Sequence, residues 1–315
     1  LWNAFDWSKF DKRQKSIKLA EIAYRCLRQN LPTADLWADA SNATEKNANA
    51  MEVKAIIEAE TRGNFEKAIA IANESLKLFP QDSKGYGARA MIELRAGAPM
   101  AARRDFEQAL KLDPQNNAYK FHLAQTYLPE LKPWYQSSIL TLPDIAPATT
   151  DARKAIEILN PLKCNPAFTA ENPLALATLA AALIRDGNLS EGSELISAYA
   201  TKHPVDSLAA QLLSEAMKKR GDNDRANTYD LQAKELAKDE AFKHAMESAK
   251  QYESGRREQA FKELKHALVY CPSANPPRKL LFEMARKDPD AEKLLKQFST
   301  LSPEDAKAYR ELQSL

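Results

Sequence analysis

The sequence predicts an all-α chain made of repeated helix-turn-helix units. It has eight glycines in 315 residues, and five of them fall on one 34-residue spacing. Prolines recur at a fixed distance after these glycines, and apolar residues recur at helical spacing between them. Such a period is typical of a helical solenoid, in which each unit packs on its neighbours.

The glycines set the register of the units. Gly63 and Gly97 are 34 residues apart, and so are the successive glycines Gly187, Gly221 and Gly255. The 90 residues between Gly97 and Gly187 equal two periods and 22 further residues, which predicts an insertion in one unit. A glycine at this place supplies the left-handed backbone conformation that ends the first helix of a unit.

Prolines mark the end of the second helix. A proline stops the helix 17 residues after four of the five glycines, at Pro80, Pro114, Pro204 and Pro272. After Gly221 the matching residue is Lys238. Small residues on both sides of the glycines predict close packing of the two helices; they are Ala68, Ala102, Gly192, Ala226 and Ala260 on one side and Ala90, Ala180, Ser214 and Ser248 on the other, with Ile56 in the first unit.

This register predicts the bounds of six pairs of helices. First helices are expected near residues 50–62, 84–96, 117–128, 173–186, 207–220 and 241–254. Second helices are expected near residues 65–79, 99–112, 151–162, 189–202, 224–237 and 257–270. We interpret their apolar faces, such as Leu176, Leu179 and Leu183, as core.

The units resemble tetratricopeptide repeats (TPRs). The resemblance is carried by Gly-Asn-Phe-Glu-Lys-Ala-Ile at 63–69, by Ala102 to Pro114 and by Ala260 to Pro272, and it covers about residues 49–272. It implies a right-handed helical solenoid of about six repeats that binds a protein or peptide along the concave face of its first helices. It implies no chemistry of its own. One departure from the family pattern is Glu52, which stands where a large apolar residue is usual.

Helical caps are expected at both ends, because a terminal repeat has to cover an exposed face. Residues 1–48 are the expected N-terminal cap, in which an apolar stripe that includes Ile17, Ile22 and Cys26 resembles an unpaired second helix. Residues 273–315 are the expected C-terminal cap, with Ser302 as the cap of a helix that begins at Pro303.

The insertion is placed at about residues 129–150, between the two helices of the third unit. It carries bulky apolar residues, among them Trp134 and Tyr135, which disordered loops usually lack. Two interpretations stay open: the insertion folds back onto its own solenoid, or it borders the groove and helps to grip a partner.

The concave groove is the predicted partner-binding site. Between the neighbourhoods of Leu174 and Leu212 it is expected to be apolar, which favours a helix or an extended apolar segment over an acidic tail. The Lys and Asn constellation with which family members clamp a C-terminal carboxylate is not repeated. The predicted groove residues are Lys54, Lys84, Met91, His122, Gln125, Leu174, Ala177, Ala181, Leu208, Leu212, Lys218 and Tyr252.

Composition and motifs argue against other classes of function. A net charge of +2 does not favour a nucleic-acid binder, and the sequence has no run of about eighteen apolar residues that would insert in a membrane. The four histidines show no pairing typical of a metal site, and no glycine-rich phosphate loop or nucleophile motif occurs, so no metal, cofactor or catalytic residue is predicted. The three cysteines form no CxxC pair and favour the cytoplasm.

Three functional hypotheses follow. The favoured one is a protein-protein interaction scaffold or adaptor without catalysis, with self-association through an end cap or the convex face as a variant. The second is a regulatory or targeting module of a longer polypeptide, because the chain begins at Leu1 without a methionine. The third, an enzyme, requires a polar cluster in the groove.

Overall fold

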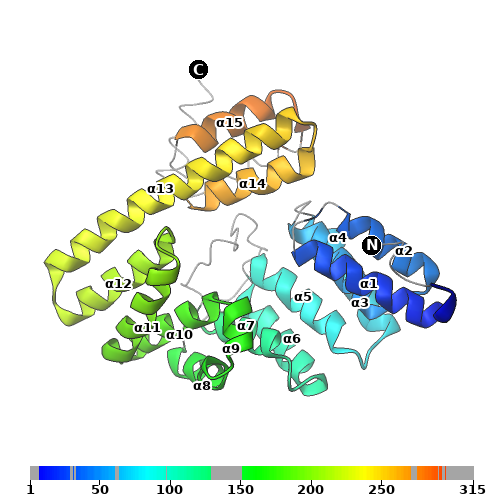
Figure 1. The fold of residues 1–315 in the computed structure, drawn as a ribbon, viewed down its shortest axis with the longest axis horizontal. Coiled ribbons are helices and arrows are strands. Elements are labelled where there is room, and N and C mark those ends of the chain that lie inside the picture. The colour runs from blue at the N-terminus through cyan, green and yellow to red at the C-terminus, as the bar shows by residue number, and fades with distance from the viewer. Residues whose placement is uncertain are drawn as a thin grey trace. The chain divides into compact units, whose positions relative to one another are not determined.

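Helices form all the regular structure of the residues described. The structure is a computed structural model that describes residues 7–28, 31, 33–60, 64–96, 98–128, 151–270, 275–289, 291, 292 and 295. Within these ranges it has fifteen α-helices, a 3-10 turn at Trp7–Lys9 and no strand. The all-α prediction is confirmed, and the chain is an array of TPR-like helical hairpins (Figure 1).

The chain forms two compact units. The first consists of residues 1–94 and 100–119 and the second of residues 95–99 and 120–315. The helices of the first unit are α1 (Lys12–Arg28), α2 (Ala34–Thr44), α3 (Ala48–Glu60), α4 (Phe65–Leu78), α5 (Ser83–Arg95) and α6 (Pro99–Leu112). The helix α7 (Asn117–Thr126) begins in the first unit and continues into the second. The helices of the second unit continue with α8 (Ala152–Lys163), α9 (Pro166–Glu171), α10 (Leu174–Asp186), α11 (Leu189–Lys202), α12 (Ser207–Arg220), α13 (Asn223–Glu253), α14 (Arg257–Tyr270) and α15 (Asn275–Ala285).

The first unit begins with a complete hairpin. The prediction of an unpaired N-terminal helix is wrong, because α1 packs on α2 and both pack on α3. Ile22 and Cys26 of α1 are buried in one cluster with Ala38 of α2 and with Val53 and Ile57 of α3. The apolar stripe of α1 is therefore covered from two sides.

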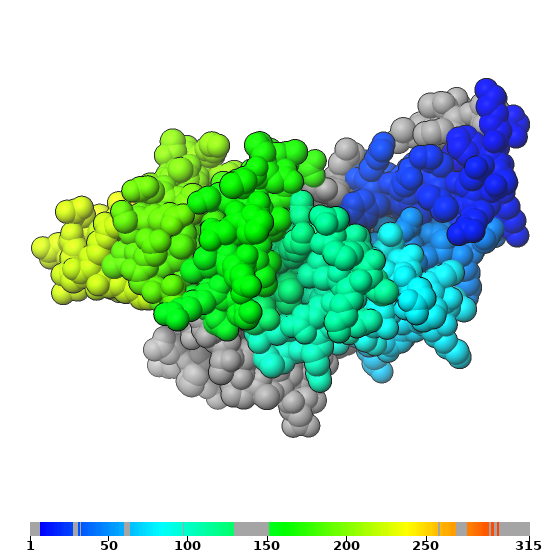
Figure 2. All heavy atoms as spheres, turned by 90° about the horizontal axis from the view of Figure 1, so that it is seen from below, coloured from blue at the N-terminus to red at the C-terminus, as the bar shows by residue number. Residues whose placement is uncertain are grey.

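In the second unit the hairpins share a continuous core. α10 packs on α8, α11 and α12, and α12 packs on α13. Leu179 and Ile184 of α10 and Ile196 of α11 have at most 1% of their surface exposed. In the space-filling view the atoms of α10 to α12, green to yellow-green, form a continuous surface (Figure 2).

Small residues bring the two helices of a hairpin together, as the sequence predicts. Ser214 Oγ donates a hydrogen bond to the Ala226 carbonyl at 3.0 Å, and 34 residues later Ser248 Oγ donates to the Ala260 carbonyl at 2.7 Å. A Cβ atom at Gly192 would lie 2.7 Å from the Ile184 side chain. These contacts leave no room for larger side chains.

Glycines and polar caps make the turns inside the hairpins. Gly187 and Gly221 end α10 and α12 in the left-handed conformation, with φ of 97° and 79°. The next residue begins the second helix, because the side chains of Asn188 and Asp222 each accept a backbone N–H three residues later. Gly255 also has a positive φ, of 73°, whereas Gly63 and Gly97 lie outside the described residues.

The predicted break between two helices at residues 238–240 is wrong, because the helix α13 runs through these residues. Instead of two helices at 224–237 and 241–254, one helix runs for 31 residues from Asn223 to Glu253. Lys238 stands at the place of the missing proline, and the neighbouring Ala-Lys-Asp-Glu-Ala sequence contains no helix breaker. α13 therefore packs on α12 with one part and on α14 with another.

Several predictions fall on residues outside the described ranges. They are the insertion at 129–150 with Trp134 and Tyr135, the helix after Ser302, and the turn at Pro272. Among the helices that are described, none has the combination of length and apolar character needed to cross a membrane.

Candidate functional site

A pocket of about 320 Å³ lies within the first unit. Small-molecule and cofactor sites have volumes of about 300–1,000 Å³, so this pocket lies at the lower end of that range. Its lining comes from α1, α3, the beginnings of α5 and α7, and the residue before α7: Ala20, Glu21, Tyr24, Arg25, Asn49, Glu52, Lys84, Asn116, Ala118 and Tyr119. We call it the Glu52 pocket.

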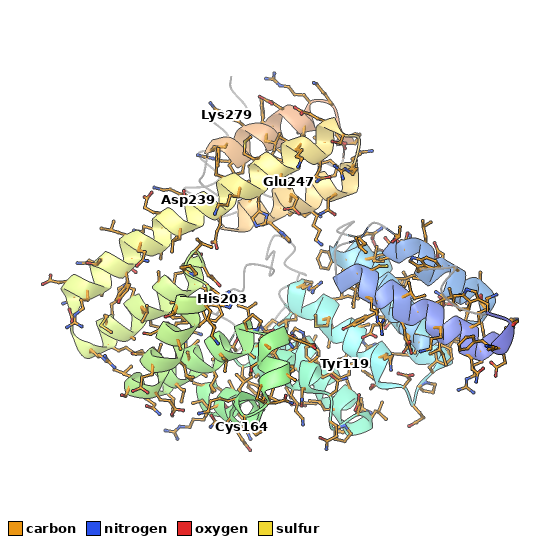
Figure 3. All side chains as sticks on the ribbon, viewed as in Figure 1. Tyr119, Cys164, His203, Asp239, Glu247 and Lys279 are labelled. Atoms are coloured by element: carbon orange, nitrogen blue, oxygen red, sulfur yellow. The ribbon has the colours of Figure 1, made fainter. Side chains whose placement is uncertain are left out.

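Glu52 and Tyr119 form the polar pair of this pocket. The Tyr119 hydroxyl lowers the pKa of the Glu52 carboxyl group, and Ser83 in turn lowers that of Tyr119. Burial raises the pKa of Tyr119, so that its hydroxyl remains a donor at neutral pH. Tyr119, labelled in Figure 3, is 7% exposed.

A glycine in the middle of α5 provides the space for the Tyr119 ring. A Cβ atom at Gly87 would lie 2.4 Å from the tip of this ring. On α6 the ring of the fully buried Phe106 lies 6.3 Å from that of Tyr119, centroid to centroid. Gly87 and Phe106 thus fix the position of the tyrosine, even though glycine costs about 1 kcal/mol in a helix interior.

Glu52 is poised between its two protonation states at neutral pH. Its pKa is raised from 4.5 to about 7, first by burial, while the Lys84 ammonium lowers it and the Asp82 carboxylate raises it further. The nearby Tyr119 hydroxyl lowers the pKa of Glu52 as well. An N–H donor from a ligand would favour the ionised form of Glu52 and would be bound strongly by it.

The raised pKa predicts a pH-dependent stability. Because folded Glu52 holds its proton up to about pH 7 and the unfolded chain releases it near pH 4.5, the free energy of unfolding falls as pH rises between these values. We expect the wild type to lose up to about 1.4 kcal/mol per pH unit relative to Glu52→Gln in this window. Urea unfolding of both chains between pH 4 and pH 8 measures this difference; a difference independent of pH would contradict it.

The rim of the pocket carries charges of both signs and an aromatic ring. Arg25 and Lys84 contribute two cations, and the Lys84 ammonium lies 3.8 Å from the Asp82 carboxylate. The negative charge of Glu21 is paired with Lys18 at 2.7 Å. Tyr24 is 42% exposed. The pocket thus offers an acceptor in its interior and cations with an aromatic surface at its rim.

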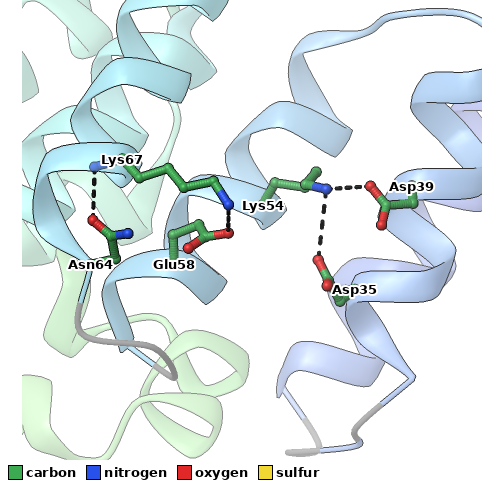
Figure 4. Close-up of polar contacts among 6 residues, drawn as sticks. All are labelled: Asp35, Asp39, Lys54, Glu58, Asn64 and Lys67. Atoms are coloured by element: carbon green, nitrogen blue, oxygen red, sulfur yellow. Dashed lines mark hydrogen bonds and ion pairs between the residues drawn. The ribbon is translucent and has the colours of Figure 1, made fainter. Parts of the chain in front are cut away.

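Of the predicted groove residues, Lys84 lines this pocket and Lys54 does not. The Lys54 ammonium pairs with the carboxylate of Asp39 and lies 3.9 Å from that of Asp35, so that it ties α3 to α2 (Figure 4). On the other side of α3, Lys67 of α4 lies 2.7 Å from the buried Glu58 (Figure 4). Lys54 therefore has a structural role.

The prediction of an apolar groove near α10 and α12 is wrong. Ala177 and Ala181 have no exposed surface and Leu212 has 3%, because all three belong to the core of the second unit. Leu174 and Leu208 are partly buried and pack on the same core. The preference for an apolar partner segment, which depended on these residues, falls with them.

The remaining predicted residues do not line this pocket. His122 Nδ1 is 2.9 Å from Oε1 of the buried Gln125, and burial lowers the pKa of His122 to about 4. Lys218 pairs with Asp230 at 2.6 Å, and Tyr252 packs on the cluster between α14 and α15. Met91 is half-buried on α5. Within the second unit, His122 and Gln125 contact each other, whereas Lys218 and Tyr252 contact other groups.

The sequence reasoning missed most of the Glu52 pocket. Asn49 lies on α3, and Asn116 and Tyr119 lie at the start of α7, 67 or more positions later, with no short motif that joins the two segments. A signal was present in Glu52 itself, a charged residue at an apolar position of the repeat.

Comparisons with known proteins give similarities of structure only. No protein-family model matches the sequence, and no curated protein matches it. PilW, a type IV pilus biogenesis factor, is 14% identical with a TM-score of 0.47, over 74% of this chain and 98% of its own. YrrB, described as a TPR protein with an unusual peptide-binding site, is 14% identical with a TM-score of 0.45, over 63% and 90%. MamA from Desulfovibrio magneticus RS-1 is 17% identical with a TM-score of 0.43, over 70% and 94%.

Proposed function

We propose that this TPR-like chain is a protein-interaction scaffold that binds an extended, acidic peptide segment of its partner in the Glu52 pocket. The observation that carries the proposal is the pairing of a half-buried acceptor, Glu52, with two cations on the rim, Arg25 and Lys84. A peptide backbone supplies N–H donors for the acceptor. An aspartate or glutamate side chain of the same peptide supplies the carboxylate for the cations.

The build of the pocket also favours binding over a purely structural role. A partly buried carboxylate costs stability unless it is well paired, and the groups around Glu52 are one tyrosine, one lysine and the like charge of Asp82. The exposed ring of Tyr24 adds the kind of aromatic surface that is enriched in interaction hot spots. No chemistry is required of any of these groups.

The experiment is a selection of random peptides displayed on phage, with the complete chain as bait. Because the display blocks the C-terminal carboxylate, only side chains can supply a carboxylate. We therefore expect the selected peptides to contain Asp or Glu. A selected peptide is then synthesised with an amidated C-terminus, and its Kd is measured by calorimetry.

Two pairs of variants locate the binding. Ala118→Trp fills the pocket from its exposed rim and Lys84→Ala removes a cation. Each is expected to weaken binding at least tenfold, which is about 1.4 kcal/mol. The controls Ala170→Trp on α9 and Lys77→Ala on α4, both at exposed positions, should bind like the wild type. Equal affinity of Ala118→Trp and the wild type would overturn the proposed site.

A further inference from the structure

A cluster of three ligand-type side chains lies in the second unit, far in sequence from the Glu52 pocket. His244 is in the second half of α13, and Glu263 and His266 are on α14. The two helices pack on each other after the turn at Gly255. Glu263 and His266 are three residues apart, so their side chains lie on the same face of α14, toward His244.

The three groups meet closely. One ligand atom from each residue lies within 4.8 Å of the ligand atoms of the other two. His244 Nδ1 is 2.7 Å from Glu263 Oε2, and the rings of His244 and His266 are 5.3 Å apart at 84°. Ligands of a tetrahedral zinc ion at about 2.0–2.2 Å are about 3.3–3.6 Å from each other, so small side-chain movements would bring all three into range.

The donor set suits a transition metal. Two imidazoles and a carboxylate are ligands of zinc and related ions, and a Glu-x-x-His spacing on one helix also supplies metal ligands in helical bundles. Burial, followed by the charge of His244, lowers the pKa of His266 to about 4, which leaves its imidazole neutral at pH 7. Burial opposes ionisation of Glu263, but its hydrogen bond and charge interaction with His244 lower its pKa overall.

The surroundings contain charges of both signs. Lys262 and Arg95 place positive charge near His266. Glu240, one turn before His244 on α13, interacts with the charge of His244 and accepts a hydrogen bond from Ser207 at 2.9 Å. Side-chain exposures of 30% for His244 and 15% for Glu263 leave access for an ion.

We propose that His244, Glu263 and His266 bind one divalent transition-metal ion of the Zn²⁺ type. Three protein ligands leave a fourth position for water or for a side chain of a bound partner. The ion joins α13 to α14 and stabilises this hairpin. The sequence predicted no metal site because its histidines show no ligand pair of the usual spacing within one helix. This site combines ligands from two helices.

The test uses the complete, untagged chain freed of metal with a chelator. Calorimetric titration with Zn²⁺ is expected to give one site per chain, and Zn²⁺ should raise the midpoint of thermal unfolding. His244→Ala and His266→Ala should each weaken binding more than tenfold, since losing even an outer partner of a metal ligand costs about 10–100-fold. His203→Ala, a histidine variant on the same unit, should bind Zn²⁺ like the wild type.

Two further measurements keep the test decisive if an alanine variant does not fold. Glu263→Gln preserves the side-chain size and should also weaken binding. Co²⁺ added to the wild type should give the intense visible absorption of a tetrahedral complex. Absence of this absorption, absence of a site at one equivalent, or unchanged affinity in the folded variants would overturn the proposal.

Discussion

Replacing Lys238 with proline is expected to destabilise the chain by about 3 kcal/mol or more. Lys238 lies in the interior of α13, which runs without a break from Asn223 to Glu253. Proline there removes the backbone donor to the Lys234 carbonyl, and its ring collides with the same group. The expected result is notable because proline is the residue that the 34-residue period places at this position in four other units.

Lys238→Ala is the matched control. It removes the exposed ion pair with Glu235, at 2.7 Å, which contributes little, and it keeps a good helix former. Urea unfolding followed by circular dichroism compares the two variants. If Lys238→Pro were as stable as Lys238→Ala, the chain would have a turn near residue 238. The single unbroken helix α13 would then be refuted.

Replacing Phe106 with alanine is expected to cost about 3–5 kcal/mol of unfolding free energy in the first unit. Phe106 has no exposed surface, so its removal leaves a cavity that the surrounding helices fill only in part. The same ring supports Tyr119 at 6.3 Å. We therefore expect the variant to lose order at the Glu52 pocket as well as stability.

Leu78→Ala on α4 controls for the loss of an apolar side chain as such. Leu78 is 45% exposed, and surface substitutions usually change stability by no more than about 0.5 kcal/mol. Thermal and urea unfolding of the two variants give the comparison. Similar losses in both would mean that Phe106 does not hold the centre of the first unit.

The fold could be predicted because its signals are periodic and local. Gly187 and Gly221 end helices where the register requires it, and the helices predicted at 189–202, 207–220 and 257–270 have those bounds. The absence of a proline at Lys238 was visible in the sequence, and its consequence, an unbroken helix, is local too. The helix α2 was missed because its mixed sequence, with Asp35 and Asp39 beside Trp37, shows a weak apolar pattern.

The sites could be predicted only in part, because they depend on contacts between distant segments. In alanine-rich α10 the sequence pattern cannot distinguish a residue that lines a groove from one in the core, and Ala177 and Ala181 prove to be core. Glu52 was recognisable as a misplaced charge, but its partner Tyr119 comes 67 positions later and needs the space left by Gly87.

The measurement that tests the central claim most directly is the footprint of the selected acidic peptide on the chain. Amide hydrogen exchange, followed by mass spectrometry, is compared with and without the peptide at saturation. We expect increased protection in α1, in α3 and in the first turns of α5 and α7, around the Glu52 pocket. The same peptide should give no protection to Ala118→Trp. Protection confined to α10, α11 and α12, with none around Glu52, would contradict the account.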